Sequence, residues 1–306
     1  MKKTQYTLPR YIIPVITWFV LGFVFIHCCH SKPAAAQQLS CEPDSCPFLS
    51  TQYSPKPTHI LLVGQDRREN ESRSRSDCMI LCSFHPENGT LTMTSFLRDL
   101  YVSIPGYSRN RLNAAYAFGG MDLIRKTFQE NFGVAIDGCV EVDFAQFSQL
   151  VDLLGGITIV LRQDEAAHIN IEVPGSSLSQ GRQNLNGAQA LAYSRIRSLD
   201  HDGDFSRTTR QRNVLMALLS HCRSASVSQL LRLFREASPM IHTDMGKGQL
   251  LSLIRQLAPT LSSMEVRSQH IPAEGTYCHQ IIDGMAVLVA DMEATRKLLS
   301  NSIMGS

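Results

Sequence analysis

The first part of the globular sequence alternates short apolar runs with polar or glycine-containing breaks. Residues 59–63 form a short apolar run that stops at a glycine, a pattern that predicts a buried strand. Residues 77–84 and 90–97 predict two further strands. Between them, residues 88–89 form the Asn-Gly dipeptide that is most typical of a tight hairpin turn. We therefore predict that the second and third strands pair as a hairpin.

Helical and extended patterns then alternate to the end of the chain. Helical spacing predicts helices over residues 121–132, 144–154, 186–193, 205–222, 227–237, 248–257 and 287–299. Runs typical of strands lie at residues 140–143, 157–161 and 265–271. Because both element types occur throughout and no repeat divides the chain, we predict an α/β fold. It would be a single α-β-α sandwich domain, residues 58–306, with a mixed central sheet.

The N-terminal segment has the pattern of a membrane-targeting sequence. Lys2, Lys3 and Arg10 precede an uncharged and mostly apolar run at residues 11–26. Positive charge before such a run predicts a cytoplasmic N-terminus and an exported remainder. The run is at the short edge of the ~17–25 residues that cross a bilayer, and it becomes long enough when residues 27–29 are included.

Two interpretations fit this segment. A transmembrane helix at residues 11–29 would leave a cytoplasmic tail at residues 1–10 and a linker rich in Ser, Pro, Ala and Gln at residues 30–57. A cleaved signal peptide is the alternative, because the three alanines at residues 34–36 resemble a cleavage site. We favour the anchor, since the apolar run ends well before these alanines. It predicts a single-pass protein of the cell membrane whose main domain is extracytoplasmic.

Composition supports a folded domain without a global charge signal. Of the 306 residues 43% are apolar and the formal net charge is +2, so a hydrophobic core is feasible and no nucleic-acid partner is expected. Any electrostatic function must then come from local clusters. The nine cysteines do not decide the redox compartment, and no cysteine or histidine spacing is typical of a metal site.

Residues 193–211 hold the densest charge cluster of the chain. This stretch contains four arginines and three aspartates around one glycine, and no lysine. The planar guanidinium binds phosphate oxygens in a bidentate manner, whereas lysine acts as a point charge. Carboxylates among such arginines indicate either a structural ion-pair network or a phosphate site that also holds a metal ion.

One face of the predicted helix at residues 205–222 changes character along its length. Asp204, Arg207 and Gln211 are spaced i, i+3, i+7, and the same face continues with apolar side chains. A polar start on an inward face implies a polar group inside the protein. The helix N-terminus also favours anions, through its free N–H groups and its dipole.

The arginines outside this face divide into two groups. Arg195 and Arg197 alternate just upstream of the helix, so an extended segment would point both in one direction. Arg210 and Arg212 lie on other faces of the helix, and we predict that they are surface charges. The candidate anion site therefore combines the first pair with Arg207.

A second charged cluster is predicted where the first three strands meet. In a hairpin the start of one strand lies beside the end of its partner, so Asp77 and Arg98 should be neighbours. Asp66 follows the first strand and Arg75 precedes the second, which keeps both at that end of the sheet. Sheet ends are common ligand positions in open α/β folds, although a rim of ion pairs would give the same pattern.

Several motifs follow one another in a specific order. They are Leu62-Val63-Gly64-Gln65-Asp66, Ser74-Arg75-Ser76-Asp77, Leu97-Arg98-Asp99, Arg111-Leu112-Asn113-Ala114-Ala115-Tyr116, Leu154-Gly155-Gly156-Ile157, Leu185-Asn186-Gly187-Ala188-Gln189-Ala190, Arg195-Ile196-Arg197, Gly203-Asp204-Phe205 and Arg210-Gln211. In order and spacing they resemble the LytR-CpsA-Psr family, and the resemblance is strong over residues 58–222.

The resemblance implies a membrane-anchored phosphotransferase that acts outside the cytoplasm. Such an enzyme moves an anionic glycopolymer, of the teichoic acid or capsular polysaccharide type, from a polyprenyl-pyrophosphate carrier to a muramic acid hydroxyl of peptidoglycan. By resemblance, the pyrophosphate-binding residues are Arg75, Arg98, Arg195, Arg197, Arg207 and Gln211, the catalytic residues are Asp77, Arg98, Asp204 and Arg75, and the Mg²⁺ ligands are Asp66 and Asp77. An apolar groove for the lipid tail is expected between the sheet and the helices.

The chemistry of these residues agrees with that interpretation. Arginines suit a multiply charged pyrophosphate, and Mg²⁺ would offset the charge that develops on the leaving phosphate. Mg²⁺ prefers one or two carboxylates plus phosphate oxygens and water, which fits Asp66 and Asp77. The roles of these two could be exchanged, one binding the metal while the other orients Arg98. Asp204 could orient an arginine or act as the base that activates the acceptor hydroxyl.

Two other functions would use the same residues. A polyprenyl-pyrophosphate pyrophosphatase would take water as the acceptor, and a non-catalytic protein would bind the lipid pyrophosphate during envelope assembly. The chain also departs from the family at two positions, with Ser206 where glycine is frequent and Thr209 where an acidic residue is common. Neither is expected to touch phosphate.

Overall fold

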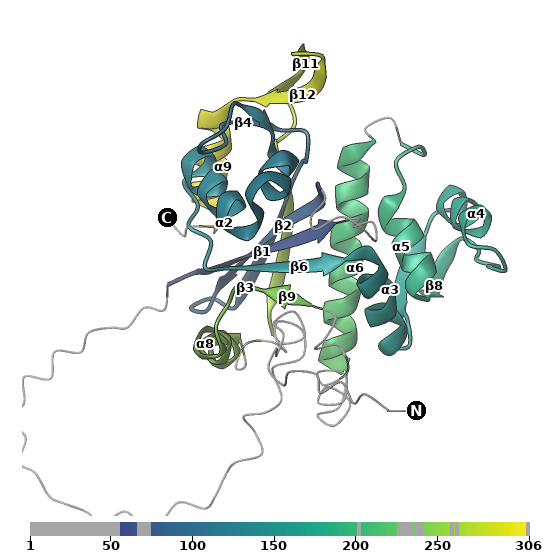
Figure 1. Ribbon diagram of the computed structural model, residues 1–306. Helices are drawn as coiled ribbons and strands as arrows, with labels where there is room; N and C mark the ends of the chain where they lie inside the picture. Colours follow the sequence, from purple (N-terminus) through teal and green to yellow (C-terminus); the bar gives the residue numbers. More distant parts are fainter. Residues whose placement is uncertain are drawn as a thin grey trace, which may run out of the picture.

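A mixed sheet forms the centre of the protein (Figure 1). The computed structural model describes residues 56–65, 75–200, 203–224, 236, 241–257, 260 and 263–303, and within them six strands pair in the order β10-β3-β2-β1-β6-β9. They are β1 (Thr58–Gln65), β2 (Ser76–His85), β3 (Thr90–Phe96), β6 (Gly138–Asp143), β9 (His242–Thr243) and β10 (Glu265–Ile271). The β1–β6 and β3–β10 pairs are parallel and the other three are antiparallel, so the predicted mixed sheet is confirmed.

The hairpin between β2 and β3 forms where the Asn-Gly dipeptide predicts it. His85 pairs with Thr90, and the register continues to Ile80 opposite Ser95. Gly89 has a φ of 63°, in the left-handed region that glycine adopts at no steric cost. The neighbouring Asn88 accepts a hydrogen bond from the main-chain N–H of Thr90 at 3.0 Å. The turn chemistry therefore sets the register that brings the two strand ends together.

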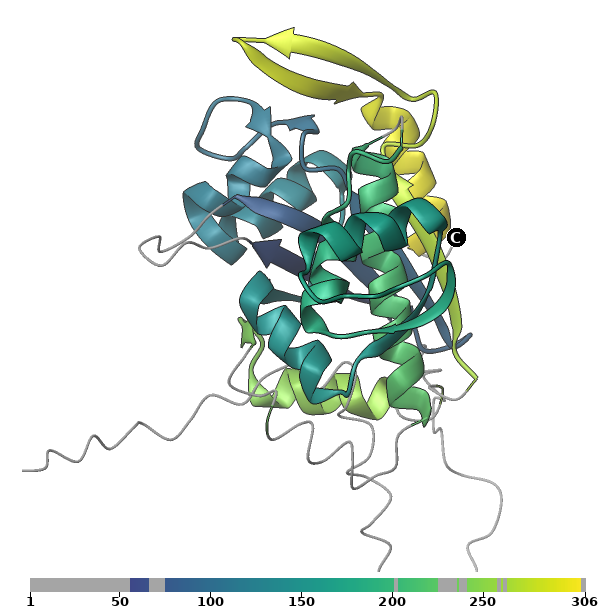
Figure 2. The same ribbon diagram turned by 90° about the vertical axis from the view of Figure 1, so that its right-hand side faces the viewer.

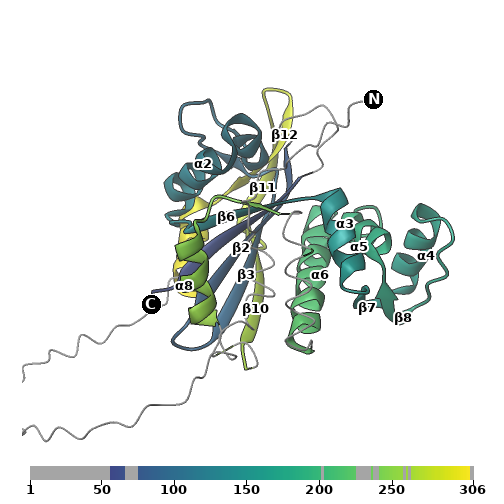
Figure 3. The same cartoon turned by 60° about the horizontal axis from the view of Figure 1, so that its bottom comes forward.

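Different helices cover the two faces of the sheet (Figures 1 and 3). Successive strand residues point to opposite faces, so Leu61 and Leu81 pack with α2 (Leu112–Phe132) and α9 (Met292–Ile303). Ile60 and Ile80 instead pack on the side of α6 (Asp204–Ser224) and α8 (Lys247–Leu257). Because both faces are buried, β1 and β2 are largely continuous apolar runs. Helices on both sheet faces agree with the predicted α/β layers.

Helix α6 is also covered on the side that faces away from the sheet (Figure 3). The covering elements are α3 (Phe144–Leu153), β7 (Ile157–Leu161), α4 (Gln163–Glu172), β8 (Gly181–Leu185) and α5 (Gly187–Arg195). Val214 and Leu218 of α6 join the apolar cluster of these elements, while Leu219 packs with the residues of the sheet. Two faces of α6 are therefore buried, one against the sheet and one against these outer elements.

The end of the chain differs from the prediction. The predicted helix at residues 287–299 is wrong in its first part, because residues 285–290 form β12 (Met285–Ala290), paired with β11 (Tyr277–Ile282) in a hairpin that projects from the body (Figure 2). Helix α9 begins only at Met292. Its start is set by Asp291, whose side chain accepts hydrogen bonds at 3.0 Å from the main-chain N–H groups of Glu293 and Ala294.

Three further features are not predicted by the apolar pattern. Helix α2 begins at Leu112 rather than at residue 121, and its two halves meet at Gly120, which has a φ of 63°. Helix α4 buries few side chains, so its helical period is weak in the sequence. A small hairpin joins β4 (Tyr101–Val102) to β5 (Asn110–Arg111), and it positions the loop that follows β3.

Some predictions fall on parts of the chain that lie outside the described residues. These are the cytoplasmic tail and transmembrane anchor at residues 1–29, the linker at residues 30–57 apart from its last two residues, and the helix at residues 227–237 apart from Glu236. Among the helices formed by described residues, none is both long and apolar enough to cross a bilayer.

Candidate active site

The hairpin brings an acid and an arginine together at one end of the sheet. Continuing the pairing of Ile80 with Ser95 toward the sheet end places Asp77 opposite Arg98. Arg98 donates a hydrogen bond from Nη1 to Oδ1 of Asp77 at 2.7 Å. The predicted contact between Asp77 and Arg98 is thus present, and it follows from hairpin register.

Of the other two residues predicted at this sheet end, the structure describes Arg75 but not Asp66. Arg75 lies exposed, directly before β2. Asp66 lies outside the described residues, one position after the end of β1. Its place in the site stays a prediction.

The start of α6 supplies the second half of the site. Asp204 opens the helix, and one of its oxygens lies 3.5 Å from Nε of Arg98. Its other oxygen lies 3.4 Å from Nη2 of Arg207 and 3.6 Å from Nε of Arg197. Arg197 also approaches the carboxylate of Asp77 at 3.8 Å. The two charge clusters found separately in the sequence therefore form one network of two carboxylates and three guanidinium groups.

Arg207 is the member of this network whose charge is least satisfied. It is only 2% exposed, and it donates from Nη2 to the main-chain oxygen of Asp77 at 3.2 Å. Its Nε and Nη1 atoms are buried with no hydrogen-bond acceptor among the described residues. Burial lowers the pKa of the Arg207 guanidinium, although the nearby Asp204 carboxylate opposes that shift. Buried guanidinium donors of this kind suit an anionic ligand.

Arg98 is stabilised more fully than Arg207. Burial acts to lower its pKa, but the hydrogen bond with Asp77 and the charge of Asp204 outweigh this, so the net shift is upward. Asp99, the next residue, lies 3.5 Å from Nε of Arg98 and 3.4 Å from Nε of Arg111. Burial raises the pKa of the Asp99 carboxyl, and a hydrogen bond with Asp204 acts in the same direction.

A polar pocket of about 700 Å³ opens beside these charges. The sequence-predicted site residues in its lining are Asp77, Arg195, Arg197, Arg207 and Gln211. Arg195 is the last residue of α5, so the segment from Arg195 to Arg197 is not simply extended, yet both arginines reach the same pocket. The guanidinium of Arg195 also lies 5.4 Å from the ring centre of Phe144. Four of the six predicted phosphate-binding residues thus share one pocket.

An apolar cavity adjoins the polar pocket. It has a volume of about 110 Å³ and lies between β1, β2 and β6 on one side and α3, α5 and α6 on the other. The two hollows share Phe144, Leu191 and Gln211 in their linings. Aliphatic side chains such as Leu215 and Leu218 also line the cavity. This is where an apolar groove is expected between the sheet and the helices.

The prediction that Arg210 and Arg212 are surface charges is wrong. Arg210 is 3% exposed and donates to Glu165 at 2.8 Å and to Asp200. Arg212 is 5% exposed and donates to the hydroxyl of Ser268 at 2.6 Å. Helical periodicity assigns one inward face, but α6 is covered on two sides, so arginines on its other faces are also buried.

Comparisons of the sequence and of the structure with known proteins both find matches to one protein family. The sequence profile of the LytR_cpsA_psr family matches residues 26–302. The polyisoprenyl-teichoic acid–peptidoglycan teichoic acid transferase TagU of Oceanobacillus iheyensis is 30% identical over 253 residues, covering 79% of this chain and 77% of that protein. TagT of B. subtilis bound to LIIa-WTA has a TM-score of 0.66 and 26% identity, over 82% of this chain and 92% of that one. The YwtF (TagT) structure with bound octaprenyl pyrophosphate lipid has a TM-score of 0.62 and 25% identity, over 82% and 91%.

Two arginines on α6 should respond differently to loss of charge. Arg210→Met leaves the buried carboxylate of Glu165 short of its partner, so we expect the free energy of unfolding to fall by about 3–5 kcal/mol. Arg207→Met removes a buried cation whose donors are incompletely satisfied, so that free energy should stay level or rise. Urea unfolding of both variants measures this. An equal loss in both would show that Arg207 is a structural ion-pair partner.

Proposed function

The chain belongs to the LytR-CpsA-Psr family, and from this membership and the site we propose that it transfers an anionic glycopolymer from a polyprenyl-pyrophosphate carrier to peptidoglycan. The product would be a phosphodiester link. A relative named as a teichoic acid transferase and a related structure with bound octaprenyl pyrophosphate lipid support this assignment. The polymer would be of the teichoic acid or capsular polysaccharide type, and the enzyme would act outside the cytoplasm from a membrane anchor at residues 11–29.

The observation that carries the proposal is that the polar pocket and the apolar cavity adjoin each other. Arg207, which has buried donors without acceptors in the described part of the chain, lines the same pocket as Arg195 and Arg197. This pocket adjoins an apolar cavity at Phe144 and Leu191. A polyprenyl pyrophosphate has the same two parts, a diphosphate of high charge joined to an apolar chain. Guanidinium groups suit the first part through bidentate hydrogen bonds, and burial of apolar surface favours the second.

The predicted site residues would have different roles in the reaction. Arg75, Arg98, Arg195, Arg197 and Arg207, with Gln211, would bind the diphosphate and stabilise the negative charge that grows on the leaving phosphate. Asp77 would orient Arg98 through the 2.7 Å hydrogen bond. Asp204, at the helix N-terminus, would accept the proton of the attacking hydroxyl.

Mg²⁺ is part of the proposal, with Asp77 and Asp66 as its protein ligands. The described residues contain no group of three or more His, Cys, Asp or Glu side chains that could hold a metal ion. Asp77 still suits an ion that arrives with the substrate, because Mg²⁺ takes one or two carboxylates and completes its shell with phosphate oxygens and water. When bound, the ion would offset part of the negative charge of the diphosphate.

Transfer can be tested with the full chain, labelled lipid-linked polymer, peptidoglycan and Mg²⁺. We expect label in the peptidoglycan fraction, and Asp77→Asn should lower the rate on the order of 10²-fold because Arg98 loses the charge that orients it. Asp122→Asn, a change of the same chemistry at an exposed site on α2, should leave the rate unchanged. Free lipid phosphate without label in the peptidoglycan would instead identify a pyrophosphatase.

The metal requirement can be tested in the same assay. Chelation with EDTA should abolish transfer, and added Mg²⁺ should restore it. If Asp77 is a ligand, Asp77→Glu, which keeps the charge, should shift the Mg²⁺ concentration for half-maximal activity upward. Full activity in EDTA would show that the arginines act without a metal ion.

The apolar cavity can be tested by filling it. Leu215→Trp should weaken binding of a polyprenyl pyrophosphate at least tenfold, because the bulky ring occupies space needed by the chain. Met216→Trp, at the next residue but 39% exposed, should bind like the wild type. Calorimetric titration measures both affinities, with circular dichroism confirming that the variants are folded. Unchanged affinity in a folded Leu215→Trp protein would place the lipid tail elsewhere.

A further inference from the structure

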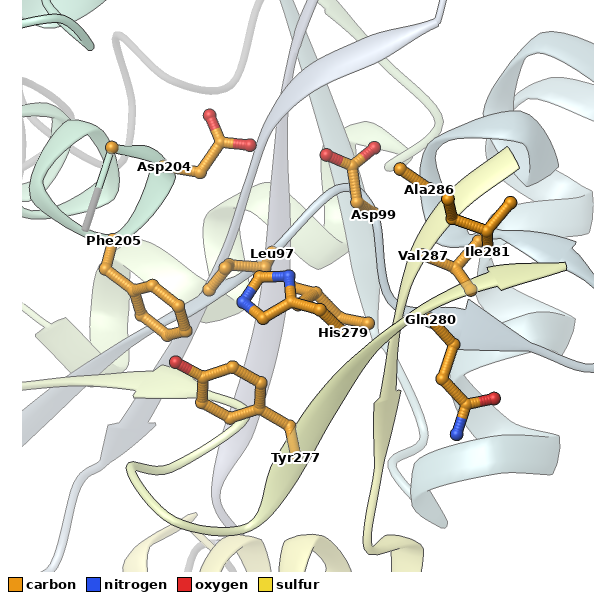
Figure 4. A pocket seen from close by; sticks show the side chains of 12 residues that line it. Leu97, Asp99, Asp204, Phe205, Tyr277, His279, Gln280, Ile281, Ala286 and Val287 are labelled. Atoms are coloured by element: carbon orange, nitrogen blue, oxygen red, sulfur yellow. The ribbon is translucent and has the colours of Figure 1, made fainter. Parts of the chain in front are cut away.

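A second large pocket lies beside the charge network, and the proposed function assigns no ligand to it (Figure 4). Its volume is about 580 Å³. The loop after β3 contributes Asp99, the start of α6 contributes Asp204 and Phe205, and the β11–β12 hairpin contributes Tyr277 and His279. These segments lie far apart in the sequence, so only the fold brings them together.

We call this second pocket the aromatic pocket. Its lining differs in chemistry from that of the polar pocket that contains Arg195, Arg197 and Arg207, which we call the arginine pocket. The described residues that line the aromatic pocket include no arginine or lysine, so it offers no strong phosphate-binding group. In Figure 4 the carboxyl groups of Asp99 and Asp204 lie on one side, and the rings of Phe205, Tyr277 and His279 gather on the other. The ring centres of Phe205 and Tyr277 are 5.2 Å apart, and those of Tyr277 and His279 are 5.6 Å apart.

This combination of groups suits a sugar. The C–H face of a pyranose ring packs on aromatic rings, and its hydroxyl groups donate hydrogen bonds to carboxylates. A lipid tail would instead meet two half-buried carboxyl groups, and a phosphate would be repelled by them. The hairpin projects from the body of the protein (Figure 2), and Ile281 near its tip is 80% exposed, so a polymeric ligand could continue past the pocket.

Asp204 lies between the aromatic pocket and the arginine pocket. Its carboxylate lines the aromatic pocket, and it also lies within 3.6 Å of Arg197 and 3.4 Å of Arg207, which line the arginine pocket. A hydroxyl group that reaches Asp204 from the aromatic side is therefore directed toward a phosphate held on the arginine side. This is the arrangement that a transfer between two bound substrates requires.

We propose that the pocket formed by Asp99, Asp204, Phe205, Tyr277 and His279 is the acceptor site, where an amino-sugar unit of the peptidoglycan glycan strand binds with one hydroxyl at Asp204. The inference rests on the proposed transfer function. In the step, the hydroxyl oxygen forms a bond to the phosphorus that carries the glycopolymer, and its proton passes to Asp204. The bond from that phosphorus to the bridging oxygen breaks, and polyprenyl monophosphate leaves with the electron pair.

Binding of the acceptor can be measured separately from transfer. The probe is a soluble tetrasaccharide of alternating N-acetylglucosamine and N-acetylmuramic acid, titrated into the full-length protein and followed by saturation-transfer NMR. Tyr277→Ala and His279→Ala should each raise the dissociation constant at least fivefold, because each removes part of the aromatic surface. Tyr277→Phe, which keeps the ring, should bind nearly as well as the wild type.

Matched controls lie outside the pocket. Tyr107→Ala removes a tyrosine that is 53% exposed and stacked on Phe118, and His242→Ala removes an exposed histidine of β9. Both should bind the tetrasaccharide like the wild type. In the transfer assay, His279→Ala should raise the KM for peptidoglycan at least fivefold and leave the KM for the lipid-linked donor unchanged.

The outcomes separate this inference from the function on which it rests. Transfer by the wild type together with unchanged peptidoglycan KM in His279→Ala and Tyr277→Ala would overturn the acceptor site and leave the transferase intact. No transfer by the wild type, with tetrasaccharide binding that the two variants weaken, would reject the transferase and still identify a saccharide site. No binding of the tetrasaccharide by the wild type would overturn the inference.

Discussion

Burial of α6 on two sides is the constraint on which the core and the candidate site both depend. Leu219 packs with the sheet, while Val214 and Leu218 pack with the outer helices. The helix needs this position for the apolar contacts of its later turns, but its first turns carry arginines into the same interior. Arg210 meets two carboxylates there, whereas Arg207 keeps unused donors. Packing of one half of the helix thus holds the other half in a state that favours anion binding.

The carboxylates of the network stabilise it before any ligand binds. Three guanidinium groups close together would repel one another, and Asp77 and Asp204 offset that repulsion. Only the Arg98–Asp77 contact is short, at 2.7 Å, while the contacts of Asp204 with the arginines lie between 3.4 and 3.6 Å. Loose contacts of this kind leave the donors of Arg197 and Arg207 able to turn to a phosphate. The acids therefore act as exchangeable partners for the arginines.

The sequence predicts the parts of the site that depend on local rules. The Asp77–Arg98 contact follows from a two-strand register, and the alignment of Asp204, Arg207 and Gln211 follows from helical periodicity. The burial of Arg210 was not predictable in this way, because it depends on α4, a polar helix with little apolar pattern. The aromatic pocket was missed for a related reason. Val287-Leu288-Val289 has an apolar pattern that also fits a helix, and only pairing with β11 shows it to be a strand.

The segment between α5 and α6 illustrates what a structural ion-pair network contributes to a neighbouring site. Arg210 donates to the main-chain oxygen of Ile196 at 3.3 Å and to the side chain of Asp200, and Arg162 donates to the same carboxylate at 2.7 Å. Arg197 lies between these two attachment points. Its backbone is therefore ordered when the chain folds, and little main-chain entropy remains to be lost when a ligand arrives. Preorganisation of this segment would favour fast and selective binding of the diphosphate that we propose as the ligand.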